Sequence, residues 1–372
     1  MSKWRQRRLE EVVQLKRGFD LAARDRRPGT FPVVGSAGVS GWHDEGPVPG
    51  PALVLGRAGA SMGVASYYET ERYWPLNTAL FVEDFKGNDP RFVFHLFQAL
   101  DLTGFNSGSV QPMLNRNYIR NVIVRIPDVG EQRNISIVIK ALHDKIAVND
   151  RITVTVDDLA STLLEGILTS DPDTTSVSLG DIATVNQRKI SPVAGGRLRY
   201  IDISSVSVGN VDWPEVGSWD EAPGRARRGV SPGDTIWSTV RPNRKSFAII
   251  LDDDPQLVVS TGFAVLSPAK VGSAFLYEVT KRDEFVQYLE NVAEGSAYPA
   301  VRAERFDKAI VPLPSPERLQ NFESIAMPLR QRAHAAAVES RSLAALRDTL
   351  LPKLMSGQIR VRDAEKVVEG AV

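Results

Sequence analysis

Two stretches of the chain carry a helical pattern of apolar and polar positions. Over residues 131–168 the apolar side chains recur every three or four positions, and residues 318–355 repeat this spacing. Such a seam is typical of helices packed side by side. A helix over the 38 residues of either stretch is roughly 57 Å long, because each residue adds about 1.5 Å, and one small domain cannot cover that length. We therefore expect the two helices to pack against each other; two helices lying separately on two cores are the alternative.

Some positions break this pattern. Both seams contain polar residues, Lys145 and Asn149 on the first and Arg332 and Glu339 on the second. The β-branched residues within 153–156 weaken the helix prediction locally and leave the path of the first helix open. Pro352 predicts a kink in the second helix or the end of its regular part.

The two stretches belong to an internal repeat. A shift of 187 positions lays residues 108–127 on residues 295–314 without a gap, and it matches Pro112 with Pro299. The same shift continues through the first helical stretch, so one register covers residues 108–168. A repeat of this length indicates two copies of one structural unit.

Short strands are predicted outside the helical stretches. In the first unit, apolar and β-branched runs separated by Gly and Pro indicate strands over 31–34, 52–56, 79–82 and 122–126, with a helix over 90–102. In the second unit the corresponding strands are 198–203, 234–238, 247–251 and 262–266, with one amphipathic helix over 274–292. The predicted fold class is α+β, with two similar mixed α/β domains joined by two long helices. The expected boundaries are 1–130 for the first domain, 131–170 for a central spacer helix, 171–316 for the second domain beginning with a polar linker at 171–178, 317–358 for a C-terminal spacer helix, and 359–372 for a polar tail.

Composition narrows the class of protein. Lys plus Arg and Asp plus Glu both number 45, so the net charge argues neither for nor against nucleic acid. The absence of Cys excludes disulfides and thiolate metal sites, and it fits a reducing compartment. The N-terminus has no apolar core for a signal peptide, and no run reaches the roughly 18 apolar residues of a membrane span. We expect a soluble, cytoplasmic protein that does not contact a membrane.

A glycine-rich loop, GRAGASMG at residues 56–63, follows a predicted strand of the first unit. A Walker phosphate loop needs Lys and then Ser or Thr after its last glycine, whereas Val64 and Ala65 stand there, so nucleotide binding is not expected. Arg57 and Ser61 offer groups suited to phosphate oxygens or a guanine edge. A tight turn with a solvated Arg is the simpler interpretation of the loop alone.

Upstream of this loop, Trp42 and His43 are expected to be exposed and to add contacts. His43, Asp44 and Glu45 could suggest a metal ligand set. Three neighbours in one loop point in different directions, however, and they lack a second cluster of ligands. No metal site is predicted here.

The second unit places a basic segment at the corresponding position. Residues 237–246 read WSTVRPNRKS, and six basic side chains fall between positions 225 and 245 against Asp234 alone. Two equivalent scaffolds whose loops carry different residues would suit the reading of two different sequences; a solvated basic loop is the alternative. The candidate contacts in this segment are Arg225, Arg227, Arg228, Arg241, Asn243, Arg244 and Lys245.

The loops that open the repeat supply second-choice contacts. They carry Gln111, Arg116 and Asn117 in the first unit, and Tyr298 and Arg302 in the second. Amide and guanidinium groups can pair with base edges. Their alternative role is to fix the entry into the following strand.

No catalytic constellation is evident. A nucleophilic Cys is absent, and the four histidines lack the spacing of metal ligands. The Asp/Asn-Pro-Pro-Tyr/Phe motif of adenine methylation does not occur. We expect a non-catalytic protein whose reaction, if any, belongs to a partner.

The chain resembles the specificity (S) subunit of type I restriction-modification systems over residues 1–361. The phrases that carry the resemblance are LLPKLMSGQIRV (350–361), LEEVVQL (9–15), LGDIATV (179–185), FPVVGSAGVSG (31–41), and the two VRIP and VPLP strands that precede the long helices. Their order and duplication make the resemblance specific.

The resemblance implies two target recognition domains that each read one half of a split site in double-stranded DNA, separated by two antiparallel helices. It also implies methyltransferase (M) subunits that carry S-adenosylmethionine and restriction (R) subunits driven by ATP, so S-adenosylmethionine, ATP and magnesium are expected on the partners and no cofactor on this chain. The competing interpretation is a non-catalytic coiled-coil scaffold with peptide- or RNA-binding heads.

Overall fold

The computed structural model describes residues 4–108, 111–295 and 298–370. The chain divides into two compact units, Met1–Ala147 with Glu339–Val372, and Val148–Val338. Two long helices, α4 (Val129–Ser170) and α9 (Pro316–Ser356), each contribute residues to both units.

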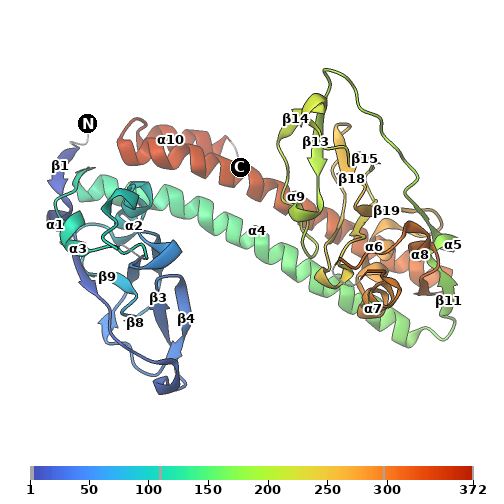
Figure 1. The fold of residues 1–372 in the computed structure, drawn as a ribbon, viewed down its shortest axis with the longest axis horizontal. Coiled ribbons are helices and arrows are strands. Elements are labelled where there is room, and N and C mark those ends of the chain that lie inside the picture. Colours follow the sequence, from blue (N-terminus) through green and yellow to red (C-terminus); the bar gives the residue numbers. More distant parts are fainter. Residues whose placement is uncertain (1–3, 109–110, 296–297, 371–372) are drawn as a thin grey trace. The chain divides into compact units, whose positions relative to one another are not determined.

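The first unit contains three sheets among its described residues, in the orders β1-β10, β2-β9-β6-β7 and β4-β3-β8-β5. All strand pairs are antiparallel except β3 with β8. Figure 1 labels several of the elements of the first unit, which have the following bounds: β1 (Arg5–Arg8), α1 (Leu9–Val12), β2 (Gln14–Arg17), η1 (Ala23–Asp25), β3 (Phe31–Gly35), β4 (Gly38–His43), β5 (Val48–Pro49), β6 (Ala52–Gly56), η2 (Gly59–Ser61), β7 (Ala65–Tyr68), β8 (Arg72–Pro75), β9 (Ala79–Asp84), α2 (Pro90–Ala99), η3 (Thr103–Phe105), α3 (Arg116–Ile119), β10 (Ile123–Ile126) and α10 (Val361–Glu369).

The second unit has the sheet orders β11-β20, β12-β19-β16-β17 and β14-β13-β18-β15 among its described residues. Its one parallel pair is β13 with β18. Its elements are β11 (Thr175–Ser178), α5 (Leu179–Ile182), β12 (Ala183–Val185), β13 (Arg197–Ile201), η4 (Ile203–Ser205), β14 (Val216–Ser218), η5 (Trp219–Glu221), β15 (Ala226–Gly229), β16 (Thr235–Ser238), η6 (Pro242–Arg244), β17 (Phe247–Ile249), β18 (Leu257–Ser260), β19 (Phe263–Pro268), α6 (Ser273–Lys281), α7 (Asp283–Val292), α8 (Ala303–Asp307) and β20 (Ile310–Leu313).

The two units therefore share one topology. Each strand of the first unit has a counterpart in the second at the same place in the same sheet, and the single parallel pair is also the same. This confirms the predicted fold class of two similar mixed α/β units with two long helices.

Within each unit the long helices pack antiparallel. In the first unit Ile139 of α4 shares an apolar core with Leu350 of α9, and Lys145 Nζ lies 3.1 Å from Glu339 Oε2. Two of the four polar seam positions thus form an ion pair with each other. In the second unit the later part of α4 packs against the earlier part of α9, with Leu164 in one core with Phe322.

Four segments differ from the sequence-based expectation. The β-branched run does not interrupt α4, and the Thr153 hydroxyl donates to the carbonyl of Asn149. Helix α9 does not end at Pro352 but continues to Ser356. The expected polar tail contains α10, whose Val361 lies in the first core because one side of that helix is apolar. The end of the expected linker forms β11, which pairs with β20.

The helix expected over 274–292 is also two helices, α6 and α7. They are separated at Arg282, which has an extended backbone with φ −61° and ψ 149°. Asp283 and Glu284 begin α7, where the positive end of the helix dipole favours acidic residues.

Candidate nucleic-acid interface

The two predicted contact loops have the same length and leave equivalent strands. Residues 57–64 connect β6 to β7, and residues 239–246 connect β16 to β17. Both loops close with the same type of bond, because Gly56 N donates to Val64 O at 2.9 Å and Ser238 N donates to Ser246 O at 2.8 Å. The structure therefore places the two loops at one position of a common scaffold.

Each loop is fixed against the loop that opens the sequence repeat. In the first unit Gly59 N donates to Pro112 O at 3.0 Å, and in the second Arg241 N donates to Pro299 O at 2.7 Å. A second equivalent pair joins Leu114 N to Arg57 O and Val301 N to Thr239 O, both at 2.7 Å. The loops at 57–64 and 239–246 thus lie against the segments that carry Gln111 and Tyr298.

The backbone of the two loops is left-handed at the same two places. Gly59 and Gly63 have φ of 74° and 80°, and their counterparts Arg241 and Lys245 both have φ of 51°. A left-handed conformation costs a residue with a side chain roughly 1–2 kcal/mol and costs glycine little. The first unit shows that glycine satisfies this loop, so folding does not require the two basic side chains of the second.

Side chains in the first unit are anchored over the loop. The guanidinium of Arg57 donates to Asn77 O at 3.4 Å and contacts Met113 Sδ at 3.5 Å, and burial, aided by Arg17, lowers the pKa of Arg57. A Cβ added to Gly59 would lie 3.1 Å from Gln111 Nε2, so the Gln111 amide lies above this glycine. Ser61 is half-buried in η2. The structure therefore brings Arg57, Ser61 and Gln111 to one loop cluster.

In the second unit an aromatic ring takes the place of the amide. The guanidinium carbon of Arg241 lies 4.4 Å from the centroid of the Tyr298 ring, and Tyr298 is 70% exposed. The 187-residue shift takes Gln111 to Tyr298. The two positions occupied by Gly59 and Gln111 in the first unit are therefore occupied by Arg241 and Tyr298 in the second.

The remaining basic residues of this loop differ in their partners. Lys245 Nζ forms an ion pair with Asp283 at 2.8 Å, and this contact lowers the pKa of Asp283. Arg302 forms one with Glu294 at 2.9 Å. Asn243 and Arg244 are exposed beside them.

The basic residues at 225–228 lie on edge strand β15 and the residue before it. Arg225 is exposed, and its carbonyl accepts from Thr261 N at 2.8 Å, next to Gly262, whose carbonyl accepts from Thr239 N. This chain of contacts brings Arg225 close to the loop at 239–246. Arg227 and Arg228 are half-buried further along β15, and burial lowers the pKa of Arg228.

Trp42 and His43 stand apart from the first loop, at the end of β4 in the other four-stranded sheet. Trp42 is 56% exposed, as expected, but His43 is 2% exposed, so the expectation of exposure is wrong for His43. The ring of His43 packs 5.4 Å from that of Trp74, and its Nδ1 accepts from Arg27 N at 2.9 Å. Arg27 also forms ion pairs with Asp44 and Glu45, so these acidic groups already have a cationic partner.

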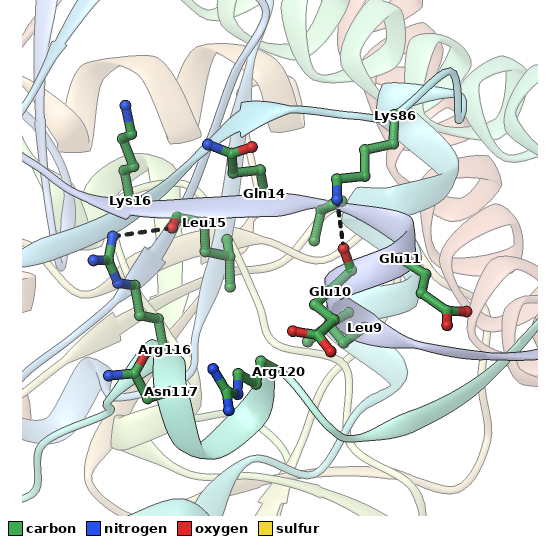
Figure 2. Close-up of a pocket in the computed structure, with 11 residues that line it drawn as sticks. Leu9, Glu10, Glu11, Gln14, Leu15, Lys16, Lys86, Arg116, Asn117 and Arg120 are labelled. Carbon is green, nitrogen blue, oxygen red and sulfur yellow. Dashed lines mark hydrogen bonds between the residues drawn. The ribbon is translucent and has the colours of Figure 1, made fainter.

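The other two predicted residues of the first unit, Arg116 and Asn117, line a cavity of about 660 Å³ (Figure 2). Arg116 Nη1 donates to Leu15 O at 3.3 Å, and Lys86 Nζ donates to Glu10 O at 2.7 Å. Arg120 follows Arg116 by one helical turn and faces the same cavity. The structure therefore separates Arg116 and Asn117 from Gln111.

The second unit does not repeat the charge of this cavity. The 187-residue shift takes Arg116, Asn117 and Arg120 to Ala303, Glu304 and Asp307. Burial, with Glu304 nearby, raises the pKa of Asp307. Helix α8 therefore forms without arginine at the positions of Arg116 and Arg120. The first-unit cavity also contains the carboxylates of Glu10 and Glu11.

Two features were not predicted from the sequence: the role of Asn106 in its loop, and the cavity that Arg116 and Arg120 line. Asn106 organises the loop that carries Gln111, because its Oδ1 accepts from Gly108 N and Met113 N, both at 2.9 Å. The four-residue spacing of Arg116 and Arg120 was the available signal for the cavity. Asn106 gave no such signal, since its role depends on the folded loop.

Metal and membrane features were searched over the same described ranges. They contain no group of three His, Cys, Asp or Glu side chains placed to hold a metal ion. None of the helices described is both long and apolar enough to span a bilayer.

The chain matches proteins of type I restriction-modification systems in sequence and in fold. Residues 1–157 match the family model described as the type I restriction modification DNA specificity domain. The chain is 26% identical over 156 residues to the type I restriction enzyme HindI specificity subunit of Haemophilus influenzae, covering 41% of this chain and 34% of that protein. It is 26% identical over 147 residues to the EcoprrI specificity subunit of Escherichia coli, covering 37% and 34%. The matched part thus spans about a third of the length of these curated relatives.

The fold is similar over nearly the whole chain to a solved structure, the S subunit of a type I restriction-modification system from M. genitalium. The TM-score is 0.66 at 16% identity, covering 95% of this chain and 96% of that one. This likeness concerns the fold, whereas the family model and the curated relatives concern the sequence. Residues 1–157 are therefore similar in sequence to the type I restriction modification DNA specificity domain, and nearly the whole chain is similar in fold to a solved type I restriction-modification S subunit.

Proposed function

We propose that this chain is the DNA-recognition subunit of a type I restriction-modification complex, and that each unit reads one half of a bipartite site in double-stranded DNA. One observation carries the proposal: the loops at 57–64 and 239–246 are held by the same backbone hydrogen bonds but present different side chains. A common scaffold with different side chains at one position suits the reading of two different base sequences.

The contact residues divide by chemistry. Side chains on or against the two loops, such as Arg241 on residues 239–246 and Gln111 against residues 57–64, can pair with base edges in the major groove. The cations of the cavity, Arg116 and Arg120, suit phosphate oxygens, which position a protein on the duplex without specifying sequence. Lys245 and Arg302 already have carboxylate partners, so they are weaker candidates for strong contacts.

The proposal includes partners for the chemistry. Methyltransferase (M) and restriction (R) subunits would carry S-adenosylmethionine, ATP and magnesium, and this chain would act in the cytoplasm as a non-catalytic scaffold for them. The two α/β units would serve as target recognition domains, with α4 and α9 as the spacer helices. The loops carry amide, hydroxyl and guanidinium groups, which can donate hydrogen bonds to DNA.

The proposal is tested by binding of the full chain, alone and co-expressed with its methyltransferase subunit, to a random-sequence duplex DNA library at several salt concentrations. We expect enrichment of a split motif, and an affinity that falls as salt rises because phosphate contacts release counterions. Equal retention of all sequences would contradict the proposal. Tighter binding to RNA or to peptides than to duplex DNA would instead support the scaffold interpretation.

A further inference from the structure

Arg241 occupies a position where the shared scaffold accepts glycine. Its N–H makes the bond to Pro299 that Gly59 makes to Pro112, and its backbone is left-handed like that of Gly59. The first unit forms this loop without any side chain at the position. The guanidinium of Arg241 is therefore not needed to build the loop, and its role lies in what it contacts.

Tyr298 contacts this guanidinium. The guanidinium carbon lies over the ring, 4.4 Å from its centroid, which is within the range of a cation–π contact. A guanidinium whose face rests on a ring keeps the N–H groups at its edge able to donate. Within the described residues Arg241 forms no ion pair with a carboxylate, unlike Lys245 with Asp283 and Arg302 with Glu294.

An oriented, planar pair of N–H donors matches one base edge in particular. The O6 and N7 acceptors of guanine accept two parallel hydrogen bonds from arginine in the major groove. A phosphate contact needs positive charge more than a fixed plane, and the exposed Arg244 in the same loop already offers such a charge. We propose that Arg241, positioned by Tyr298, reads a guanine in the half-site bound by the second unit. This inference rests on the proposed function.

The test compares base preferences of full-chain variants, each co-expressed with the methyltransferase subunit, on a random-sequence duplex library. Arg241→Lys keeps the charge but loses the paired donors, and Lys245 shows that lysine adopts the same left-handed backbone in this loop. Arg241→Gly removes the side chain in a conformation that Gly59 already adopts. Arg197→Gln, at an exposed position of β13 in the same unit, is the control for loss of one charge.

We expect the wild-type motif to contain a guanine whose preference falls about tenfold or more in both Arg241 variants, with every other position unchanged. Arg197→Gln is expected to keep that preference. Tyr298→Phe retains the ring and is expected to retain the preference, whereas Tyr298→Ala is expected to weaken it.

The possible results separate the inference from the function on which it rests. A split motif that is unchanged in Arg241→Lys would overturn the guanine assignment and leave the proposed function intact. A uniform loss of affinity across all sequences in Arg241→Gly would assign Arg241 to a phosphate and also overturn it. A wild-type complex that selects no motif would overturn both.

Discussion

Arg241 in the second unit and Gly59 in the first hold the same backbone position, each with a left-handed φ and each donating its N–H to the equivalent proline. One of the two residues carries a guanidinium and the other carries no side chain. The difference between the two units therefore lies in the side chains on a shared loop and not in the path of that loop.

Replacing Arg241 with glycine is expected to leave stability within about 1 kcal/mol of wild type. Relief of the left-handed backbone, roughly 1–2 kcal/mol, is offset by loss of the Tyr298 stack, about 0.5–1 kcal/mol, and by the greater freedom of glycine in the unfolded chain. Arg241→Val is the matched contrast, because a β-branched residue is strained at positive φ, and we expect a loss of about 2 kcal/mol. Urea unfolding measures both. Equal destabilisation by Gly and Val would show that the backbone conformation is not the cause.

The readout pair of the second unit is expected to function when moved to the first. In Gly59→Arg combined with Gln111→Tyr, the Cβ added at position 59 is accommodated, because the one atom near it is the flexible end of Gln111, which the second substitution replaces. We expect a cost of roughly 1–2 kcal/mol from the left-handed arginine and a new guanine preference in the first half-site. Base-resolved selection from a random library measures this preference. A change in the second half-site would contradict the assignment of one loop to each half.

A buried ionic cluster in the second unit is expected to be sensitive to loss of one member. Glu278, whose side chain is fully buried, pairs with Arg330 of α9 and with Lys281 at 3.0 Å. Arg330→Met removes one of these partners from a buried carboxylate, and we expect a loss of about 3 kcal/mol. Adding Glu278→Leu is expected to restore much of it, because no charge then lacks a partner. If the double variant is no more stable than Arg330→Met, the loss does not come from a buried carboxylate without its partner.

The same cluster is expected to make stability fall in acid. Burial raises the pKa of Asp157, but hydrogen bonds and ion pairs with Lys281 and Arg330 outweigh it, and the net pKa lies below the ordinary 3.8. A carboxyl with a lowered folded-state pKa contributes stability above pH 3.8, which is lost as pH falls through the lowered value. Asp157→Asn is expected to reduce this loss in unfolding titrations between neutral pH and strong acid. An unchanged acid dependence would contradict the assignment.

His95 gives the first unit a pH dependence at a milder range. Burial lowers its pKa from 6.5 to about 4, so below pH 6.5 the unfolded chain takes up a proton that the folded chain excludes. Stability is therefore expected to fall from pH 6.5 to 4, by up to about 3 kcal/mol at roughly 1.4 kcal/mol per pH unit. Hydrogen exchange of α2 measures it, and His95→Phe is expected to flatten the dependence. A slope equal to that of wild type in this variant would exclude His95 as the source.

The spacing of apolar and polar residues along the chain was enough to predict the long helices and several strands. The helical seams, the strand runs at 52–56 and 79–82, and the matching positions of the two loops follow from spacing and from the repeat. The burial of His43 against Trp74 does not, because it depends on how two strands pack. The break at Arg282 was hidden by a continuous amphipathic pattern on both sides.

The candidate site was predictable only in outline. Sequence placed Arg241 and Tyr298 in two separate loops, and only the folded unit brings them into contact. The left-handed backbone of Arg241 and Lys245 could not be predicted from these residue types, because glycine is the residue that usually adopts this conformation. Likewise, Lys145 and Glu339 are polar interruptions of two separate seams in the sequence, and only the packed helices bring them together as an ion pair.

The most direct measurement of the central claim is the bound-sequence profile of two single variants in the full complex, Gln111→Ala in the first unit and Arg241→Gly in the second. If each unit reads its own half of a split DNA site, Gln111→Ala will change base preferences in one half only, and Arg241→Gly will change them in the other half only. A profile in which both variants alter the same half, or in which either one alters both halves, would contradict the claim.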